Sequence, residues 1–280
     1  MRIRIARNLL AAILASLAVV AAASGATETF EKAYSLDGVS RVRLENVNGG
    51  INVRSWDRNY IRVTATKTGS QTSLDHTIIR VTQPGGEIRI ETISTRKHHI
   101  FFFLFSSERL ARVEYELLLP TATPLKLETV NGSISIGARR GEIRAETVNG
   151  GIDMRGIDAT VDAETVNGRI FVSQQTSRET KLETVNGSIE AEFPSDASLR
   201  YNLETINGSM EVGERRSHAH ALGIKSFEGE INGGRALFKA SSVNGSIRVR
   251  LEGGSTPREA APREDHPDRL TKPEDDDSGV

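Results

Sequence analysis

Apolar and polar residues alternate along most of the chain, in short runs that recur at nearly constant spacing. In one of them, Ile143, Ala145 and Thr147 fall on one face of an expected strand, and Ile152 and Met154 resume the apolar pattern after an Asn-Gly dipeptide. Alternation with a period of two, in runs rich in β-branched residues, is typical of half-buried β-strands. Beyond the N-terminal segment no helical periodicity occurs. The pattern therefore predicts an all-β fold.

One pentapeptide, Glu-Thr-Val-Asn-Gly, punctuates these runs. Four copies and a fifth with Ile in place of Val follow one another at steps of 18, 18, 19 and 21 residues, and weaker copies lie at 47–49, 231–233 and 243–245. A nearly fixed step is the signature of stacked structural repeats. The repeated dipeptides are Asn131-Gly132, Asn149-Gly150, Asn167-Gly168, Asn186-Gly187 and Asn207-Gly208.

Two folds are compatible with this repeat. Asn-Gly between two strands is a strong hairpin signal, and a series of hairpins would form an antiparallel meander. Alternatively each Asn-Gly marks a corner, and each unit is one coil of a parallel β-solenoid. The solenoid accounts for more, because equivalent residues of successive coils then stack about 4.8 Å apart, which favours the same residue type in every copy.

The stacked copies predict rows of identical side chains. The five asparagines are expected to form a hydrogen-bonded amide ladder at the corner, in a backbone conformation that tolerates the left-handed region, and each following Gly is expected to supply a positive φ. We interpret these rows as structural. The row of pentapeptide glutamates has two interpretations: a solvated row neutralised by Lys126, Arg144 and Lys181, or a surface that binds a cation or a cationic partner.

The ends of the chain differ from the repeats. Residues 1–26 resemble a signal peptide, with three early arginines, an apolar run from Leu9 to Ala23 and small residues before position 27. An uncleaved anchor is the alternative, but this run is shorter than the ~20 residues that span a bilayer. We predict a solenoid domain over 27–252, with irregular strands in 27–120 as an N-terminal β cap and regular repeats in 121–252. The Pro- and charge-rich tail, 253–280, is predicted to be disordered.

A phenylalanine-rich stretch interrupts the N-terminal region. It contains Phe101, Phe102, Phe103 and Phe105 and follows the basic run 96–99. Consecutive rings cannot all enter one core from a single strand. Either alternate rings pack on the solenoid while the others cover its open end, or the stretch is an exposed loop that contacts a membrane or a partner.

Composition excludes several classes of function. The formal net charge is -1, from 36 basic and 37 acidic residues, so nucleic-acid binding is not expected. The chain has no Cys, which excludes thiol catalysis and Cys-ligated metals. No phosphate-binding loop, nucleophile elbow or zinc-binding helix motif occurs. We therefore predict no catalytic residues, no cofactor and no metal site.

The run Val113–Pro120, followed by Leu125–Ile134 and its copies, resembles the bacterial β-strand-repeat family labelled putative adhesin, of the toast-rack type. The likeness covers about 28–252. It implies a right-handed single-stranded β-helix in the bacterial envelope, with no catalytic residues to transfer. The resulting hypothesis is a non-catalytic exported protein of the periplasm or cell surface, or secreted, that contacts an envelope protein or glycan. The alternatives are a polysaccharide-acting β-helix enzyme and a purely structural envelope component. The oligomeric state is not indicated.

Overall fold

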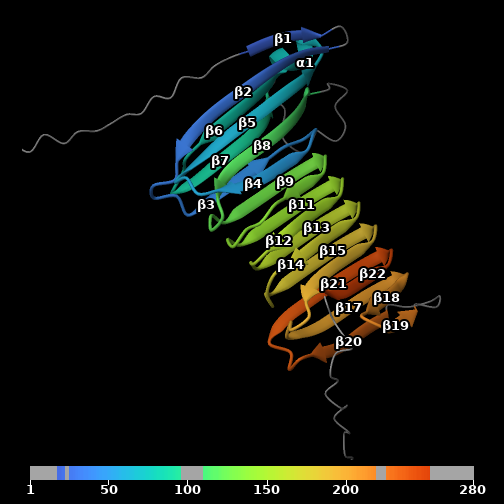
Figure 1. Ribbon diagram of the computed structural model, residues 1–280. Coiled ribbons are helices and arrows are strands. Elements are labelled where there is room, and N and C mark those ends of the chain that lie inside the picture. The colour runs from blue at the N-terminus through green and yellow to red at the C-terminus, as the bar shows by residue number, and fades with distance from the viewer. Residues whose placement is uncertain (1–17, 23–24, 96–109, 219–224, 253–280) are drawn as a thin grey trace, which may run out of the picture.

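A computed structural model describes residues 18–22, 25–95, 110–218 and 225–252. In this part of the chain, strands form two long sheets that run side by side along a common axis (Figure 1). The twelve-stranded sheet contains, in spatial order, β1 (Ala18–Ala22), β2 (Gly25–Ser35), β5 (Tyr60–Gly69), β8 (Arg112–Pro120), β4 (Ile51–Trp56), β10 (Ile134–Ile136), β12 (Ile152–Ile157), β14 (Ile170–Gln174), β16 (Ile189–Pro194), β22 (Ile247–Glu252), β18 (Ser209–Val212) and β19 (Arg215–His218). The ten-stranded sheet contains β20 (Lys225–Ile231), β17 (Leu199–Asn207), β21 (Ala236–Asn244), β15 (Thr180–Asn186), β13 (Val161–Asn167), β11 (Ile143–Asn149), β9 (Leu125–Asn131), β3 (Arg41–Glu45), β7 (Glu87–Ser94) and β6 (Thr77–Thr82).

Each repeat is one coil that contributes a strand to each sheet. In the coil formed by β11 and β12, β11 pairs in parallel with β9 and β13, and β12 pairs in parallel with β10 and β14. The pairing joins like to like: Thr147 lies opposite Thr165 and Asn149 opposite Asn167. These parallel ladders confirm the predicted solenoid and exclude the meander.

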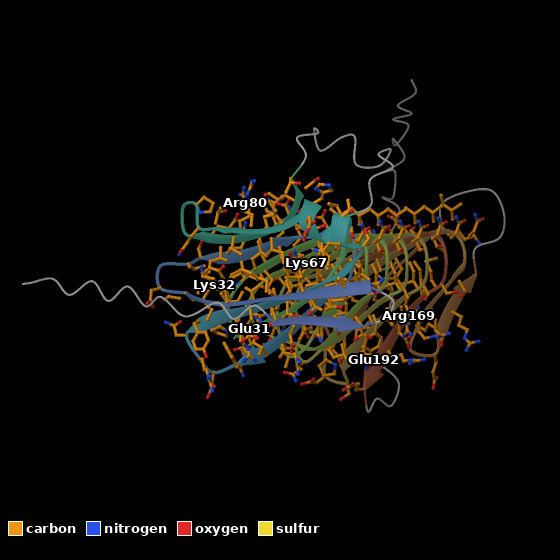
Figure 2. All side chains as sticks on the ribbon, turned by 90° about the horizontal axis from the view of Figure 1, so that it is seen from above. Glu31, Lys32, Lys67, Arg80, Arg169 and Glu192 are labelled. Carbon is orange, nitrogen blue, oxygen red and sulfur yellow. The ribbon has the colours of Figure 1, made fainter. Side chains whose placement is uncertain are left out.

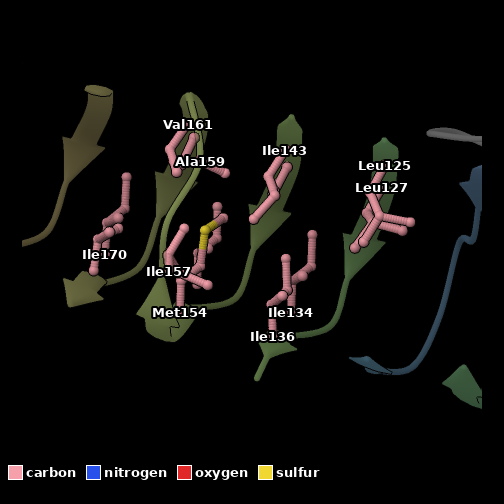
Figure 3. Packing of buried hydrophobic residues seen from close by; sticks show 14 of the residues in the cluster. Leu125, Leu127, Ile134, Ile136, Ile143, Met154, Ile157, Ala159, Val161 and Ile170 are labelled. Atoms are coloured by element: carbon pink, nitrogen blue, oxygen red, sulfur yellow. The ribbon is translucent and has the colours of Figure 1, made fainter. Parts of the chain in front are cut away.

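The core lies between the two sheets. It is filled by inward-facing aliphatic side chains, such as Leu127 and Ile143 from one sheet and Ile134 and Met154 from the other, all of which are buried (Figure 3). Full burial of a side chain of this size stabilises a fold by about 1.5–3 kcal/mol. Since the chain has no disulfide, this continuous apolar core and the backbone ladders stabilise the described region.

The N-terminal end of the stack departs from the parallel pattern. There β2, β5 and β8 pair antiparallel in one sheet, as do β6 and β7 in the other. A short helix, α1 (Gln71–His76), begins after Ser70, whose hydroxyl accepts a hydrogen bond from the Ser73 amide. Lys67, labelled in Figure 2, donates to the Leu74 and Thr77 carbonyls beside it. Six residues are too few to produce a periodic pattern in the sequence, and the all-β prediction holds.

At the C-terminal end, the order of the coils in space differs from their order in the sequence. We expected the coil of Asn207 to follow that of Asn186. Instead β21 lies between β15 and β17, and β22 lies between β16 and β18, so the coil of Asn244 separates the two. The chain reaches this slot through β20, which runs antiparallel to β17. A turn of three residues with positive φ, Asn232, Gly233 and Gly234, then leads into β21. None of the five pentapeptide asparagines has the left-handed conformation that we had expected for them, whereas Asn232, in a weaker copy, does.

One buried cation links the N-terminal strands to the repeats. Arg139 is only 1% exposed and donates from Nη2 to the carbonyls of Pro120 (2.8 Å) and Thr123 (2.6 Å). Burial lowers the pKa of this guanidinium to about 10, so it is still charged at neutral pH. Its function is to satisfy carbonyls where the chain leaves β8 and enters β9.

We expect Arg139→Met to lower the free energy of unfolding by about 2–3 kcal/mol, because two partly buried carbonyls lose their charge-assisted donor while most of the side-chain volume is kept. Chemical denaturation at neutral pH measures this difference. Arg140→Met, next in sequence at an exposed position, is the control and should change stability by less than about 0.5 kcal/mol. Equal effects of the two substitutions would contradict the assigned role of Arg139.

Candidate functional site

The outer face of the ten-stranded sheet carries three straight rows of side chains, which we call the striped face. The strand register stacks each row along the solenoid axis, one residue per strand. The first, mainly basic row contains Arg43, Lys126, Arg144, Asp162, Lys181 and Lys239. The second, acidic row contains Glu45, Glu128, Glu146, Glu164, Glu183, Ser241 and Glu204. The third, apolar row contains Val130, Val148, Val166, Val185, Val243 and Ile206.

An amide ladder borders the apolar row. Each asparagine Nδ2 donates to Oδ1 of the asparagine in the preceding coil of the stack, at 2.8 to 2.9 Å. The ladder includes two copies that the sequence pattern marks only weakly, Asn48 and Asn244. Because every amide in the series is oriented the same way, the ladder fixes the spacing of the coils along this edge. Its order is Asn48, Asn131, Asn149, Asn167, Asn186, Asn244 and Asn207.

The glycine after each asparagine is required for a reason different from the one expected. Gly132, Gly150, Gly168, Gly187 and Gly208 have no positive φ. A Cβ on any of them would instead lie 1.9 to 2.0 Å from the carbonyl oxygen of the neighbouring coil's glycine. That carbonyl also accepts the hydroxyl of the pentapeptide threonine, as Gly150 does from Thr165 at 2.9 Å. The corner is therefore packed too closely for any side chain.

The two charged rows pair with each other. Arg144 donates from Nε to Glu146 Oε1 at 2.6 Å, and this hydrogen bond raises the pKa of Arg144. Lys181 lies 3.3 Å from Glu164 Oε1 and 3.1 Å from Glu183 Oε2. Partial burial alone would lower the pKa of Lys181, but the bonds and charges of Glu183, Asp162 and Glu164 raise it overall. The predicted neutralisation of the glutamate row by neighbouring cations is thus present in the geometry.

Neutralisation is incomplete at the middle of the rows. Strand β13 places two carboxylates outward, Asp162 and Glu164, and no cation of its own. From β9 to β15 the two charged rows hold Asp162 and four glutamates against three cations, Lys126, Arg144 and Lys181. The negative excess lies beside Val166, near the centre of the striped face.

A shallow groove of about 540 Å³ runs between the acidic and apolar rows, across β9, β11, β13, β15 and β21. Its walls are glutamate and valine side chains, and the pentapeptide threonines lie at its base. Val148, Val166 and Val185 are 38%, 39% and 40% exposed. Among the described residues, five of the six exposed large hydrophobic side chains belong to this row, the exception being Ile78.

The opposite face of the molecule lacks such rows. On the outer side of the twelve-stranded sheet, Asp153, Phe171 and Glu190 occupy one register position in three successive coils. Phe171 is held between Arg155 and Arg169, whose guanidinium carbons lie 4.5 and 5.4 Å from its ring centroid. Figure 2 labels Arg169 and Glu192 on this side of the stack. The regular pattern is therefore a property of one sheet.

The ladder residues were predicted from the repeat, whereas the apolar row was not. Glu and Val stand two positions apart in the pentapeptide, so strand alternation places them on the same face as soon as the glutamates are taken to point outward. Phe101, Phe102, Phe103, Phe105 and the tail 253–280 lie outside the described residues. No group of three potential metal-binding side chains occurs among the described residues. Within that same part of the chain, no helix reaches the length and apolarity needed to cross a bilayer.

The fold and its striped face define an all-β solenoid built from parallel strands. In agreement with the resemblance, residues 121–250 match the family model Toastrack DUF4097. No curated protein matches the sequence.

Three solved structures of bacterial proteins are among those to which this chain is similar. A putative cell adhesion protein from Clostridium sporogenes has a TM-score of 0.46 and 12% identity, covering 81% of this chain and 100% of that one. A putative adhesin from Bacteroides fragilis has a TM-score of 0.42 and 9% identity, covering 79% and 96%. A putative lipid binding protein from Parabacteroides distasonis has a TM-score of 0.37 and 15% identity, covering 79% and 96%.

Proposed function

We propose that this protein is a non-catalytic, exported envelope module that holds another macromolecule against its striped face. The observation that carries the proposal is the apolar row: five of the six exposed large hydrophobic side chains of the described residues stand in one line. Apolar side chains gathered at one place on a surface, with polar residues around them, are typical of contact sites. Export is supported by the signal-like N-terminal segment, and the envelope location by the resemblance of the repeat to the bacterial putative-adhesin family.

The solenoid suits this role because it is stiff. Each coil is hydrogen-bonded to its neighbours through both sheets and through the amide ladder. Presenting a preformed row avoids the entropy cost of ordering contact residues when a partner binds. Catalysis, in contrast, needs a unique constellation of reactive groups, and the striped face repeats the same groups in each coil.

Substitution of the apolar row tests the proposal. We expect Val148→Thr/Val166→Thr/Val185→Thr to reduce binding of the purified full chain to envelope fractions by about tenfold, since each lost apolar contact contributes a fraction of a kcal/mol or more and tenfold corresponds to 1.4 kcal/mol. Threonine keeps the β-branched shape, so the strands should be unaffected. Quantitative pull-down of the chain by separated membrane, protein and glycan fractions provides the measurement.

The matched control lies on the other sheet. Asp153→Asn/Glu192→Gln/Glu211→Gln changes three outward residues of the twelve-stranded sheet and should bind as the wild type does. Unchanged binding by the valine variant, or an equal loss in both variants, would refute the striped face as the contact surface. A purely structural component should show no saturable binding to any fraction.

A further inference from the structure

The striped face has the dimensions and chemistry of a docking site for one kind of partner, and this inference rests on the proposed function. We propose that the groove between the acidic and apolar rows binds a basic amphipathic α-helix of another protein, aligned along the solenoid axis. Its cationic side chains would lie over the glutamates and its apolar side chains over the valines.

The repeat distance favours a helix over an extended segment. Coils of the stack are spaced by about 4.8 Å, so the groove presents one glutamate and one valine at that interval. A helix returns a side chain to the same face every 5.4 Å, whereas an extended strand does so every 6.6 to 6.8 Å. Across the five strands of the groove, about 19 Å, a helix stays nearly in step and a strand does not.

The charge of the groove determines which charge the partner must carry. The cations of the basic row approach the glutamates from the side away from the valines, because Arg144 precedes Glu146 by two residues and Val148 follows it by two. Each ion pair of Glu146 and Glu164 uses one carboxylate oxygen, Oε1. The negative excess at Asp162 and Glu164 in β13 then favours a positive group on the groove side.

The apolar row requires more than a cation. Long Lys and Arg side chains lay their methylene stems along apolar surface while the charged ends stay near carboxylates. A helix with a basic stripe next to a leucine stripe would therefore satisfy both walls of the groove together. Among the described residues, the helix of this chain, α1, has the sequence QTSLDH and no such stripe. The proposal takes a segment of a different protein as the occupant.

Binding of a designed peptide tests the proposal. The probe is a cross-linked helical peptide of about 16 residues, roughly 24 Å long, with adjacent lysine and leucine stripes on an alanine background. Its isomer has the same composition with lysine and leucine scattered around the helix. Fluorescence anisotropy with the purified full chain should show the striped peptide binding at least about tenfold more tightly than the isomer, and less tightly as salt rises.

Variants locate the site. Glu146→Gln/Glu164→Gln/Glu183→Gln should weaken binding of the striped peptide at least about tenfold, and the valine-to-threonine triple variant at least about threefold, the latter at low and high salt alike. The control variant Asp153→Asn/Glu192→Gln/Glu211→Gln should bind as the wild type does. Thermal unfolding of each variant confirms that the fold is retained.

Four outcomes would overturn the inference: no binding, equal binding of the two isomers, displacement of the peptide by spermine at equal concentration, or a glutamine variant that binds as the wild type does. Loss of peptide binding together with retained, valine-dependent binding to envelope fractions would leave the proposed function standing and remove only the helix. Loss of both would remove the striped face as a contact surface.

Discussion

Gly168→Ala is expected to destabilise the solenoid by at least about 3 kcal/mol, which is more than overpacking of a side chain usually costs. The added Cβ would lie 1.9 Å from the Gly150 carbonyl oxygen, which is backbone and accepts the hydroxyl of Thr165. No rotamer change can relieve such a contact, so neighbouring coils must separate at the corner. Urea denaturation followed by circular dichroism measures the loss.

Gly137→Ala is the matched control for this corner. A Cβ at Gly137 would have its nearest neighbour, the Val53 carbonyl oxygen, at an ordinary 3.6 Å, and the residue has no positive φ. Alanine should therefore be neutral or raise stability by up to about 1 kcal/mol, since it reduces the entropy of the unfolded chain. Tolerance of alanine at both positions would show that the corner is looser than the structure indicates.

Truncation after Arg235 is expected to unfold the C-terminal part of the stack, whereas truncation after Glu252 leaves the described strands intact. The shorter chain lacks β21 and β22, which lie within the two sheets and not at their ends. It loses four buried hydrophobic side chains, Phe238, Ala240, Ile247 and Val249, and burial of such groups contributes about 5 kcal/mol or more in total. Hydrogen exchange should show the amides of β17 and β18 losing protection.

The opposite result would also be informative. Strand β17 pairs with β21 in the same register in which β21 pairs with β15, so Asn207 could in principle stack directly on Asn186. If the amides of β17 in the shorter chain were as protected from hydrogen exchange as in the wild type, the coil of Asn207 would have docked directly on the coil of Asn186. In that case the inserted coil would be dispensable, contrary to our expectation.

Much of the regular stack follows from local sequence. Alternation fixes which side of each strand is buried, and the identical pentapeptides indicate that like residues are stacked. The irregular strands predicted in 27–120 are present and include β3, β4, β5, β6, β7 and β8. These features are predictable because strand periodicity is a property of a few consecutive residues.

Other features depend on contacts between distant residues. Nothing in the sequence distinguishes the buried Arg139 from the many surface cations. Its burial is explained by the backbone carbonyls of Pro120 and Thr123, which accept its hydrogen bonds. The residues of the apolar row belong to the pentapeptide, but their exposure and the groove beside them arise only when the coils stack. The pentapeptide glycines were predicted at the correct positions, but a positive φ was the wrong reason. They are required because a carbonyl oxygen of the neighbouring coil lies too close for a Cβ.

The sequence by itself determined that the chain builds half-buried strands from a repeated unit, because alternation and repetition are properties of short segments. It favoured parallel pairing, which the structure confirmed. Only the tertiary structure decided the order of the coils, with Asn244 between Asn186 and Asn207. The physical reason is that every coil offers its neighbours the same amide, hydroxyl and aliphatic groups in the same register. Interchangeable coils have no preferred order in their own residues, so the return strand β20 and the turn at Asn232–Gly234 make the choice.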